Sequence, residues 1–322
     1  MDKTKIEPDW YKLTGKLDFP LTNDYLFRAL LQKNNNTLKG LISALLHINF
    51  DTISSVRITN EIPLGETIDA KHFILDINVI MNEGTLINLE MQVVNEKNWV
   101  ERSMSYLCRS YDNLNGGASY TDAKPAIQIG LLDYTLFPER PEFYATYYLS
   151  NEKTHEKYSD KLRLSVLDLT RIDLATEEDR EYAIDYWARF FKATTWEELK
   201  MIATGNEIIS DAVTTVYNTT NDQLIRDQIR ARDEAIAYEK FMQNQLAAHE
   251  KKIAENERQL AENEKQLAEK EKQLAKNEKQ LAENEKQLAK NEKQIAENEK
   301  QLAEKDAIIE NLMKQLAATK TE

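Results

Sequence analysis

The residues that could do chemistry in this 322-residue chain gather between residues 71 and 93, where acid and amide side chains alternate with apolar ones. Two apolar runs flank residues 82–84, whose composition, Asn-Glu-Gly, is typical of a three-residue hairpin loop with its glycine in the left-handed conformation. Antiparallel strands around this loop pair residues that lie equally far from its centre. Asp76 is therefore expected opposite Glu90.

The alternation of side chains along a strand divides this hairpin into two faces. The apolar face, which we expect to pack into the core, carries Leu75, Ile77, Val79, Ile87, Leu89 and Met91. The other face concentrates Asp76, Asn78, Asn88, Glu90 and Gln92.

Two carboxylates directly opposite across a strand pair have Cβ atoms only ~5 Å apart, and like charges at that distance destabilise the sheet. A divalent cation removes the repulsion, since Mg²⁺ binds one or two protein carboxylates, keeps waters and takes further oxygens from a phosphate. Such a site polarises a phosphodiester and lowers the pKa of a bound water. The alternative is an exposed hairpin face with ordinary polar residues, and a register shift of one residue would separate Asp76 from Glu90.

At these residues the sequence resembles the PD-(D/E)XK nuclease superfamily, and more closely its bacterial recombination-promoting nucleases and transposase-like proteins. The superfamily pattern is an Asp on one strand followed by acid-x-Lys on the next, which corresponds here to Asp76 and Glu90-Met91-Gln92. The family that it resembles commonly has Gln in place of the Lys. Other stretches that match the family are Asn23-Asp24-Tyr25-Leu26-Phe27, then Arg102, Tyr106, Gly117 and Tyr120, and residues 220–233. The resemblance covers residues 15–240 and leaves the tail outside.

This resemblance implies a metal-dependent DNA endonuclease that hydrolyses phosphodiester bonds. Asp76 and Glu90 would bind Mg²⁺ or Mn²⁺, and Gln92 would orient the attacking water. Gln92 lacks the charge of the superfamily lysine. Lys97 or Arg102 could supply that charge from nearby, although each is equally suited to a surface position or a helix ion pair.

Asp24 is a candidate accessory acid from the first helix, but an acid at a helix N-terminus also suits the helix dipole. A second hypothesis, from a different functional class, is a catalytically degenerate nuclease fold that serves as a scaffold, with the tail recruiting partners. The absence of a charge at Gln92 and the acidity of the chain favour this alternative.

The charge balance excludes a broadly basic surface for nucleic-acid binding, since the chain has 42 Lys and Arg against 55 Asp and Glu. The last 73 residues hold 17 acidic and 15 basic residues, which leaves 38 acidic and 27 basic residues, a net charge of −11, in residues 1–249. Any contact with DNA must therefore be local or bridged by metal. No apolar run approaches the ~18–20 residues of a membrane helix, and no signal-peptide core follows Met1, so we expect a cytoplasmic protein without membrane contact.

Other catalytic chemistries have little support in the sequence. The four histidines, His47, His72, His155 and His249, show no i, i+4 pair of the kind that binds zinc on a helix. The single cysteine, Cys108, excludes a disulfide framework and is expected as a small core residue. No Gly-x-Ser-x-Gly elbow and no glycine-rich phosphate loop is present.

The elements that must position the candidate site follow from hydrophobic periodicity. Strands are expected within residues 55–62, 72–80, 86–93, 126–132, 143–150 and 162–169, and helices within 23–47 (one or two), 99–114, 177–203 and 206–218. This order predicts an α/β fold, a restriction-endonuclease-like core with a mixed central sheet flanked by helices, then a helical region and a long C-terminal coiled-coil helix. We expect a nuclease-like domain at 1–175, a helical region completing it at 176–244, and a heptad-repeat coiled coil at 245–322.

The tail repeats with a period of seven residues. Its apolar positions are Ile253, Leu260, Leu267, Leu274, Leu281, Leu288, Ile295, Leu302, Ile309 and Leu316. A seven-residue period predicts a left-handed supercoil when a partner is present. Because the repeat has one apolar seam instead of two, we expect weak homo-oligomerisation, most simply a parallel dimer; the alternative is a solvated single helix.

Overall fold

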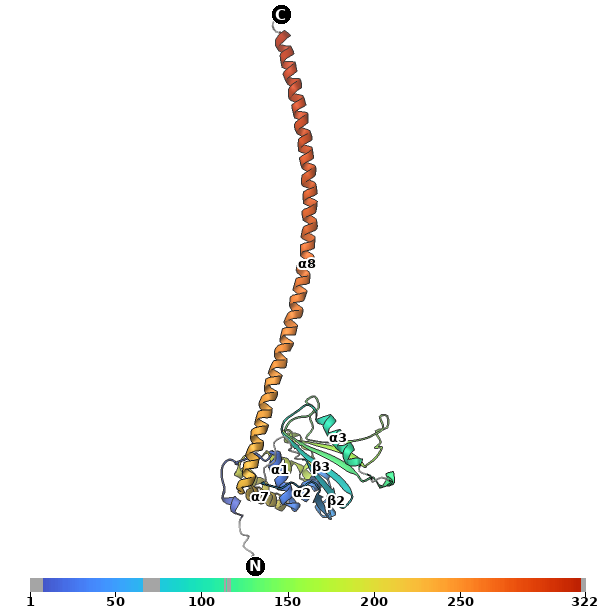
Figure 1. Ribbon diagram of the computed structural model, residues 1–322, viewed down its shortest axis with the longest axis vertical. Helices are drawn as coiled ribbons and strands as arrows, with labels where there is room; N and C mark the ends of the chain where they lie inside the picture. The colour runs from blue at the N-terminus through green and yellow to red at the C-terminus, as the bar shows by residue number, and fades with distance from the viewer. Residues whose placement is uncertain (1–7, 66–75, 113, 115–116, 320–322) are drawn as a thin grey trace, which may run out of the picture. The chain divides into compact units, whose positions relative to one another are not determined.

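The computed structural model describes residues 8–65, 76–112, 114 and 117–319, with side chains in the tail described as far as residue 314. The chain divides into two compact units, Met1–Gln243 and Asn244–Glu322. The first unit contains a sheet with helices on both faces (Figure 1).

The sheet has six strands in the order β1-β2-β3-β4-β6-β5. They are β1 (Val56–Ile58), β2 (Ile77–Met81), β3 (Thr85–Gln92), β4 (Ala126–Leu132), β5 (Tyr144–Tyr148) and β6 (Leu162–Asp168). Strands β1 to β3 pair antiparallel, β3, β4 and β6 pair parallel, and β5 is an antiparallel edge strand. The predicted mixed sheet is confirmed. Residues 72–75 of the expected second strand lie outside the described residues.

The hairpin β2–β3 has the expected register, with Asn78 opposite Asn88. The expectation for its loop is wrong in one respect, because the left-handed conformation falls on Asn82 (φ 49°) and Glu83 (φ 57°), not on Gly84. Asn tolerates this conformation, and the Asn82 side chain also accepts hydrogen bonds from the backbone N–H groups of residues 54 and 55. A contact outside the hairpin therefore helps to select the turn.

Helices cover the two faces of the sheet unequally. The helices are α1 (Asp24–Lys33), α2 (Asn35–Leu46), α3 (Trp99–Tyr111), α4 (Glu177–Glu181), α5 (Ile184–Lys192), α6 (Trp196–Ala203), α7 (Glu207–Thr220) and α8 (Gln223–Thr319). Short 3₁₀ turns lie at Asp9–Lys12, Phe50–Thr52, Tyr120–Asp122 and Ile172–Leu174. Helices α1, α2, α5 and α7 share the main core with the apolar face of β2 and β3, and α3 packs on the opposite face (Figure 1).

Capping residues set the helix boundaries in the first unit. Asn34 ends α1 and caps α2, where its side chain accepts from the backbone N–H of Thr37, so the expected helical stretch over 23–47 is two helices. The single helix expected over 177–203 is three. Ala183 takes a left-handed conformation between α4 and α5, and Thr195 starts α6 with a capping box.

Helix α3 is held on the sheet by a close approach between Trp99 and Gly130. A Cβ atom on Gly130 would lie 2.1 Å from the Trp99 ring, so glycine is required for the indole to lie on β4. Gly130 pairs with Glu90 in the parallel ladder. The first turns of α3 are thereby placed beside the polar face of β3. Cys108 lies on the outer side of α3 and is exposed, contrary to the expectation of a core position.

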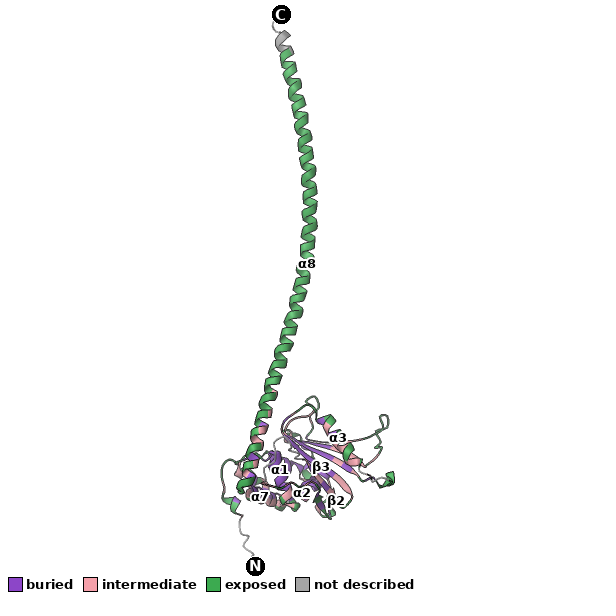
Figure 2. Ribbon diagram, in the orientation of Figure 1, coloured by how far each residue is buried: buried purple, intermediate pink, exposed green. Residues whose placement is uncertain are grey.

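The second unit is the continuation of α8, and its side chains are exposed throughout the described part (Figure 2). The apolar heptad residues from Ile253 to Ile309 are each 52–63% exposed. In the described part of the chain no helix is long and apolar enough to cross a membrane.

Candidate active site

The residues expected to carry chemistry meet at a cavity of about 70 Å³ on the α3 face of the sheet. It is lined by side chains from five parts of the fold, among them Asp24, Asp76, Glu90, Gln92, Arg102 and Arg232. All three residues predicted to be catalytic are present, as are two of the three predicted accessory residues. The third, Lys97, is exposed and does not line the cavity.

Glu90 is the most deeply buried acid of the cavity, with 5% of its surface exposed. Its Oε1 accepts a charge-assisted hydrogen bond from Arg102 Nη2 at 2.8 Å, and its Oε2 has no hydrogen-bond partner among the described residues. Burial raises the pKa of Glu90 to about 7; Arg102 opposes this effect, and the charges of Asp76 and Glu96 add to it. A buried carboxylate with one unpaired oxygen is suited to bind a cation.

Arg102 brings a positive charge into the cavity that Gln92 also lines. It lies 2.8 Å from Glu90 and 3.7 Å from Glu96 and comes from the first turns of α3. Of the two cations considered from the sequence, Arg102 reaches the cavity and Lys97 does not. The decisive contact is the packing of Trp99 on Gly130, because it sets the position of α3.

Asp76 is anchored through its main chain and oriented through its side chain. Its carbonyl oxygen accepts from Arg28 Nη1 at 2.6 Å and from Asn60 Nδ2 at 2.9 Å. Arg28 is fully buried and also donates to the carbonyl oxygen of Asn60. The Asp76 carboxylate accepts from Asn88 Nδ2 at 2.7 Å, which leaves its other oxygen available to the cavity. Neighbours that orient a ligand carboxylate in this way are typical of metal sites.

Gln92 is oriented by Tyr134, a residue that the sequence analysis missed. Tyr134 Oη donates to Gln92 Oε1 at 2.8 Å, so the Gln92 amide nitrogen is the end left to donate. Burial raises the pKa of Tyr134, which therefore stays a neutral donor. The sequence carried no signal for this contact, because it depends on the parallel pairing of Gln92 with Leu132, two residues before Tyr134.

Asp24 enters the cavity already paired. Arg232, near the start of α8, donates to it in a two-pronged arrangement, from Nε to Oδ1 at 2.8 Å and from Nη2 to Oδ2 at 2.7 Å. Asn23 strengthens the same junction, because its side chain donates to Asp233 at 2.6 Å. Sequence analysis did not single out Arg232 as a site residue, since more than 200 positions separate it from Asp24.

The family described as PD-(D/E)XK nuclease family transposase matches residues 21–245, which include every residue of this cavity. The chain belongs to this family. The match confirms the resemblance seen in the sequence, and it accounts for the mixed sheet with flanking helices. The family associates the fold with hydrolysis of phosphodiester bonds in DNA, and PD-(D/E)XK nucleases generally use divalent metal ions. No curated protein and no solved structure matches the chain.

The donor set of this family member fits a magnesium-like ion held by few protein ligands. Within the described residues no cluster of three or more His, Cys, Asp or Glu side chains has the arrangement of a metal site. Asp24, Glu96 and Glu239 also line the cavity, but Arg232 pairs with Asp24 and Glu239, and Glu96 lies 3.7 Å from Arg102. Asp76 and the unpaired Oε2 of Glu90 are the ligand groups that remain. Mg²⁺ accepts such a sparse set, because it retains waters and takes further oxygens from a phosphate.

Proposed function

We propose that this protein is a metal-dependent DNA endonuclease of the recombination-promoting, transposase-like type. Asp76 and Glu90 hold Mg²⁺ or Mn²⁺, and Gln92 and Arg102 act on the phosphodiester beside them. The observation that carries this proposal is the meeting of Asp76, Glu90 and Gln92 at one cavity, with a buried Glu90 oxygen that has no partner among the described residues.

Each side chain has a separate part in the proposed reaction. The bound metal supplies polarisation of the phosphodiester and a lower pKa for an attacking water. Gln92, held by Tyr134, presents its amide N–H to the water or to a phosphate oxygen. Arg102 provides the positive charge that Gln92 lacks and can move from Glu90 to the phosphate, since its side chain is 36% exposed.

Plasmid nicking in Mg²⁺ or Mn²⁺ tests the proposal. Asp76→Ala and Glu90→Ala should abolish nicking while tryptophan fluorescence shows that the fold is retained. Glu101→Ala removes an exposed acid of α3 and is the matched control, with unchanged cleavage expected. Full activity in Asp76→Ala would refute the assignment.

Metal binding has a readout that does not require DNA. A cation that binds only the folded state stabilises it by RT ln(1 + [L]/Kd), about 2.7 kcal/mol at a hundredfold excess over Kd. Millimolar Mg²⁺ or Mn²⁺ should raise the melting temperature of the wild type, and Glu90→Gln should weaken the response. An unchanged wild-type melting temperature would count against the Asp76–Glu90 site.

The second candidate function is a catalytically degenerate nuclease fold that acts as a coiled-coil interaction protein. The observation that favours it is the row of heptad residues along α8, each more than half exposed from Ile253 to Ile309. We propose that this row mediates weak self-association of residues 245–322, whichever of the two functions holds. Failure of both the nicking and the melting experiments would favour the scaffold function.

A further inference from the structure

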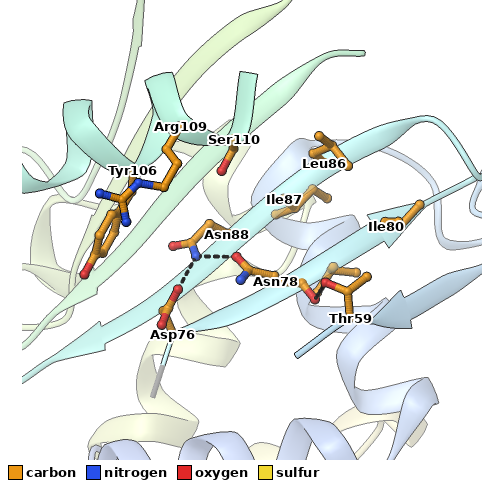
Figure 3. Close-up of a pocket in the computed structure, with 11 residues that line it drawn as sticks. Thr59, Asp76, Asn78, Ile80, Leu86, Ile87, Asn88, Tyr106, Arg109 and Ser110 are labelled. Atoms are coloured by element: carbon orange, nitrogen blue, oxygen red, sulfur yellow. Dashed lines mark hydrogen bonds between the residues drawn. The ribbon is translucent and has the colours of Figure 1, made fainter. Parts of the chain in front are cut away.

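A second and larger cavity, of about 500 Å³, lies between α3 and the polar face of β2 and β3 (Figure 3). From the sheet side it is lined by Asp76, Asn78 and Asn88, and from α3 by Tyr106, Arg109 and Ser110. Asp76 borders both this cavity and the candidate active site. Its volume is within the range of about 300–1,000 Å³ that is typical of small-molecule sites.

The orientation of Asn88 follows from its contact with Asp76. Asn88 Nδ2 donates to Asp76 Oδ2 at 2.7 Å, and because a carboxylate only accepts, the amide nitrogen must point that way. The Asn88 oxygen is then turned to the opposite side, where Figure 3 shows it on the side of Tyr106 and Arg109. Asn88 is 4% exposed, and in the described part of the chain its Oδ1 has no hydrogen-bond partner.

The orientation of the Asn78 amide follows from its contact with Asn88. Asn88 Nδ2 also donates to Asn78 Oδ1 at 2.7 Å, so the Asn78 amide nitrogen is the end left to donate. The floor of the cavity thus offers an acceptor on Asn88 beside a donor on Asn78. An adjacent acceptor and donor complement the edge of a nucleobase, as in the pairing of Asn with the amino and ring nitrogens of adenine.

Helix α3 supplies the opposite wall with a different chemistry. Arg102, Tyr106 and Arg109 are spaced by four and three residues and therefore lie on one face of the helix. The guanidinium carbons of Arg102 and Arg109 lie 5.4 Å and 6.0 Å from the centre of the Tyr106 ring. An aromatic ring flanked by arginines is the combination that binds single-stranded nucleic acid, the ring by stacking and the cations by phosphate contact.

We propose that this cavity binds one unstacked nucleotide of a DNA strand, next to the phosphodiester that the metal site cuts. The base edge meets Asn78 and Asn88, the base stacks on Tyr106, and Arg109 contacts a backbone phosphate. Asp76, common to both cavities, joins the base subsite to the metal site. The inference rests on the proposed function in taking a DNA strand as substrate. Because the faces of a base in a duplex are covered by its stacked neighbours, stacking on Tyr106 selects single-stranded or frayed DNA.

Fluorescence anisotropy of the full chain in EDTA tests this subsite without cleavage. The probes are a labelled single-stranded oligonucleotide and the duplex of the same length. The single strand should bind more tightly than the duplex. Tyr106→Ala should weaken single-strand binding roughly 5- to 150-fold, the usual contribution of one stacked base, and Tyr106→Phe should restore it. Met104→Ala, on the opposite and exposed side of α3, is the matched control and should bind as the wild type.

Two further variants keep the test independent of the tyrosine. Arg109→Gln changes an exposed side chain. The slope of log K against log salt concentration for single-strand binding should become shallower by about 0.7, the value expected for one phosphate contact. Asn78→Ala removes the donor without placing a second carboxylate beside Asp76, so it should weaken binding of the single strand.

The outcomes separate this inference from the nuclease proposal. A wild type that does not prefer the single strand, or Tyr106→Ala and Asn78→Ala variants that bind it unchanged, overturns the subsite even if the protein nicks plasmid DNA. Single-strand binding that depends on Tyr106 in a protein that fails to nick supports the subsite and overturns the nuclease proposal.

Discussion

Replacing Glu90 by Gln should stabilise the metal-free protein above neutral pH. Burial raises the pKa of Glu90 from 4.5 to about 7, against the opposing charge of Arg102. The folded protein therefore retains a proton on Glu90 in a pH range where the unfolded chain has released it. Gln at this position is neutral at every pH and resembles the protonated acid in shape, so the variant lacks the cost of a buried charge.

The sign and size of the effect follow from proton linkage. Between pH 4.5 and about 7 the folded state binds more protons than the unfolded state, so the free energy of unfolding falls as the pH rises through this window. At 1.36 kcal/mol per pH unit, the whole Glu90 contribution is about 3 kcal/mol, and about 2.5 kcal/mol of it is lost between pH 5 and pH 8. Above pH 8 Glu90→Gln should therefore be about 3 kcal/mol more stable than the wild type, or about 6–12 °C in melting temperature for a unit of this size.

Urea unfolding in EDTA, followed by tryptophan fluorescence at pH 5 and pH 8, measures this difference. The four tryptophans, Trp10, Trp99, Trp187 and Trp196, all belong to the first unit, so the tail does not contribute to the signal. Glu96→Gln is the control, because Glu96 lies beside the same Arg102 but its side chain is 42% exposed. Wild type and Glu90→Gln with the same loss of stability from pH 5 to pH 8 would refute the desolvation argument.

Three other outcomes are expected. Gly130→Ala forces a Cβ atom to within 2.1 Å of the tryptophan that starts α3. Overpacking of this kind should lower the free energy of unfolding in urea by about 1–3 kcal/mol. The control, Gly84→Ala, has its nearest atom at 3.7 Å and should change this free energy little. Arg232→Ala leaves the Asp24 carboxylate buried without its cation and should cost about 3–5 kcal/mol, most of which Asp24→Asn should restore in the double variant. In sedimentation the full chain should self-associate weakly, more so at higher concentration, whereas a chain that ends before the heptads should stay monomeric. If both chains are monomeric at tens of micromolar, the tail is a solvated spacer.

Local patterns in the sequence determined the polar face of the hairpin. Side chains alternate with a period of two, and two apolar runs with a short loop between them allow one register in which the apolar residues share a face. The pairing of Asn78 with Asn88 and the location of Asp76 and Glu90 at one cavity therefore agree with the analysis of the sequence. The seven-residue repeat likewise predicted the tail helix, because helical periodicity is a local property.

The charges that complete the candidate site were decided by tertiary structure. Lys97 and Arg102 are equally plausible in the sequence, and the packing of Trp99 on Gly130 is what turns Arg102 toward Glu90. The same docking leaves Cys108 outward, because α3 buries Trp99 and Ser103 and Cys108 lies on another side of the helix.

The residues that contact Gln92 and Asp24 come from distant parts of the chain, and no pattern in the sequence indicated them. Tyr134 meets Gln92 because β4 lies parallel to β3, and Arg232 meets Asp24 because α8 begins beside α1. Periodicity reports which side of an element is buried, but it carries no information on which element lies against it. The sequence by itself therefore determined the acids and the face that they share, and only the packing of α3, β4 and α8 decided which groups neutralise and orient them.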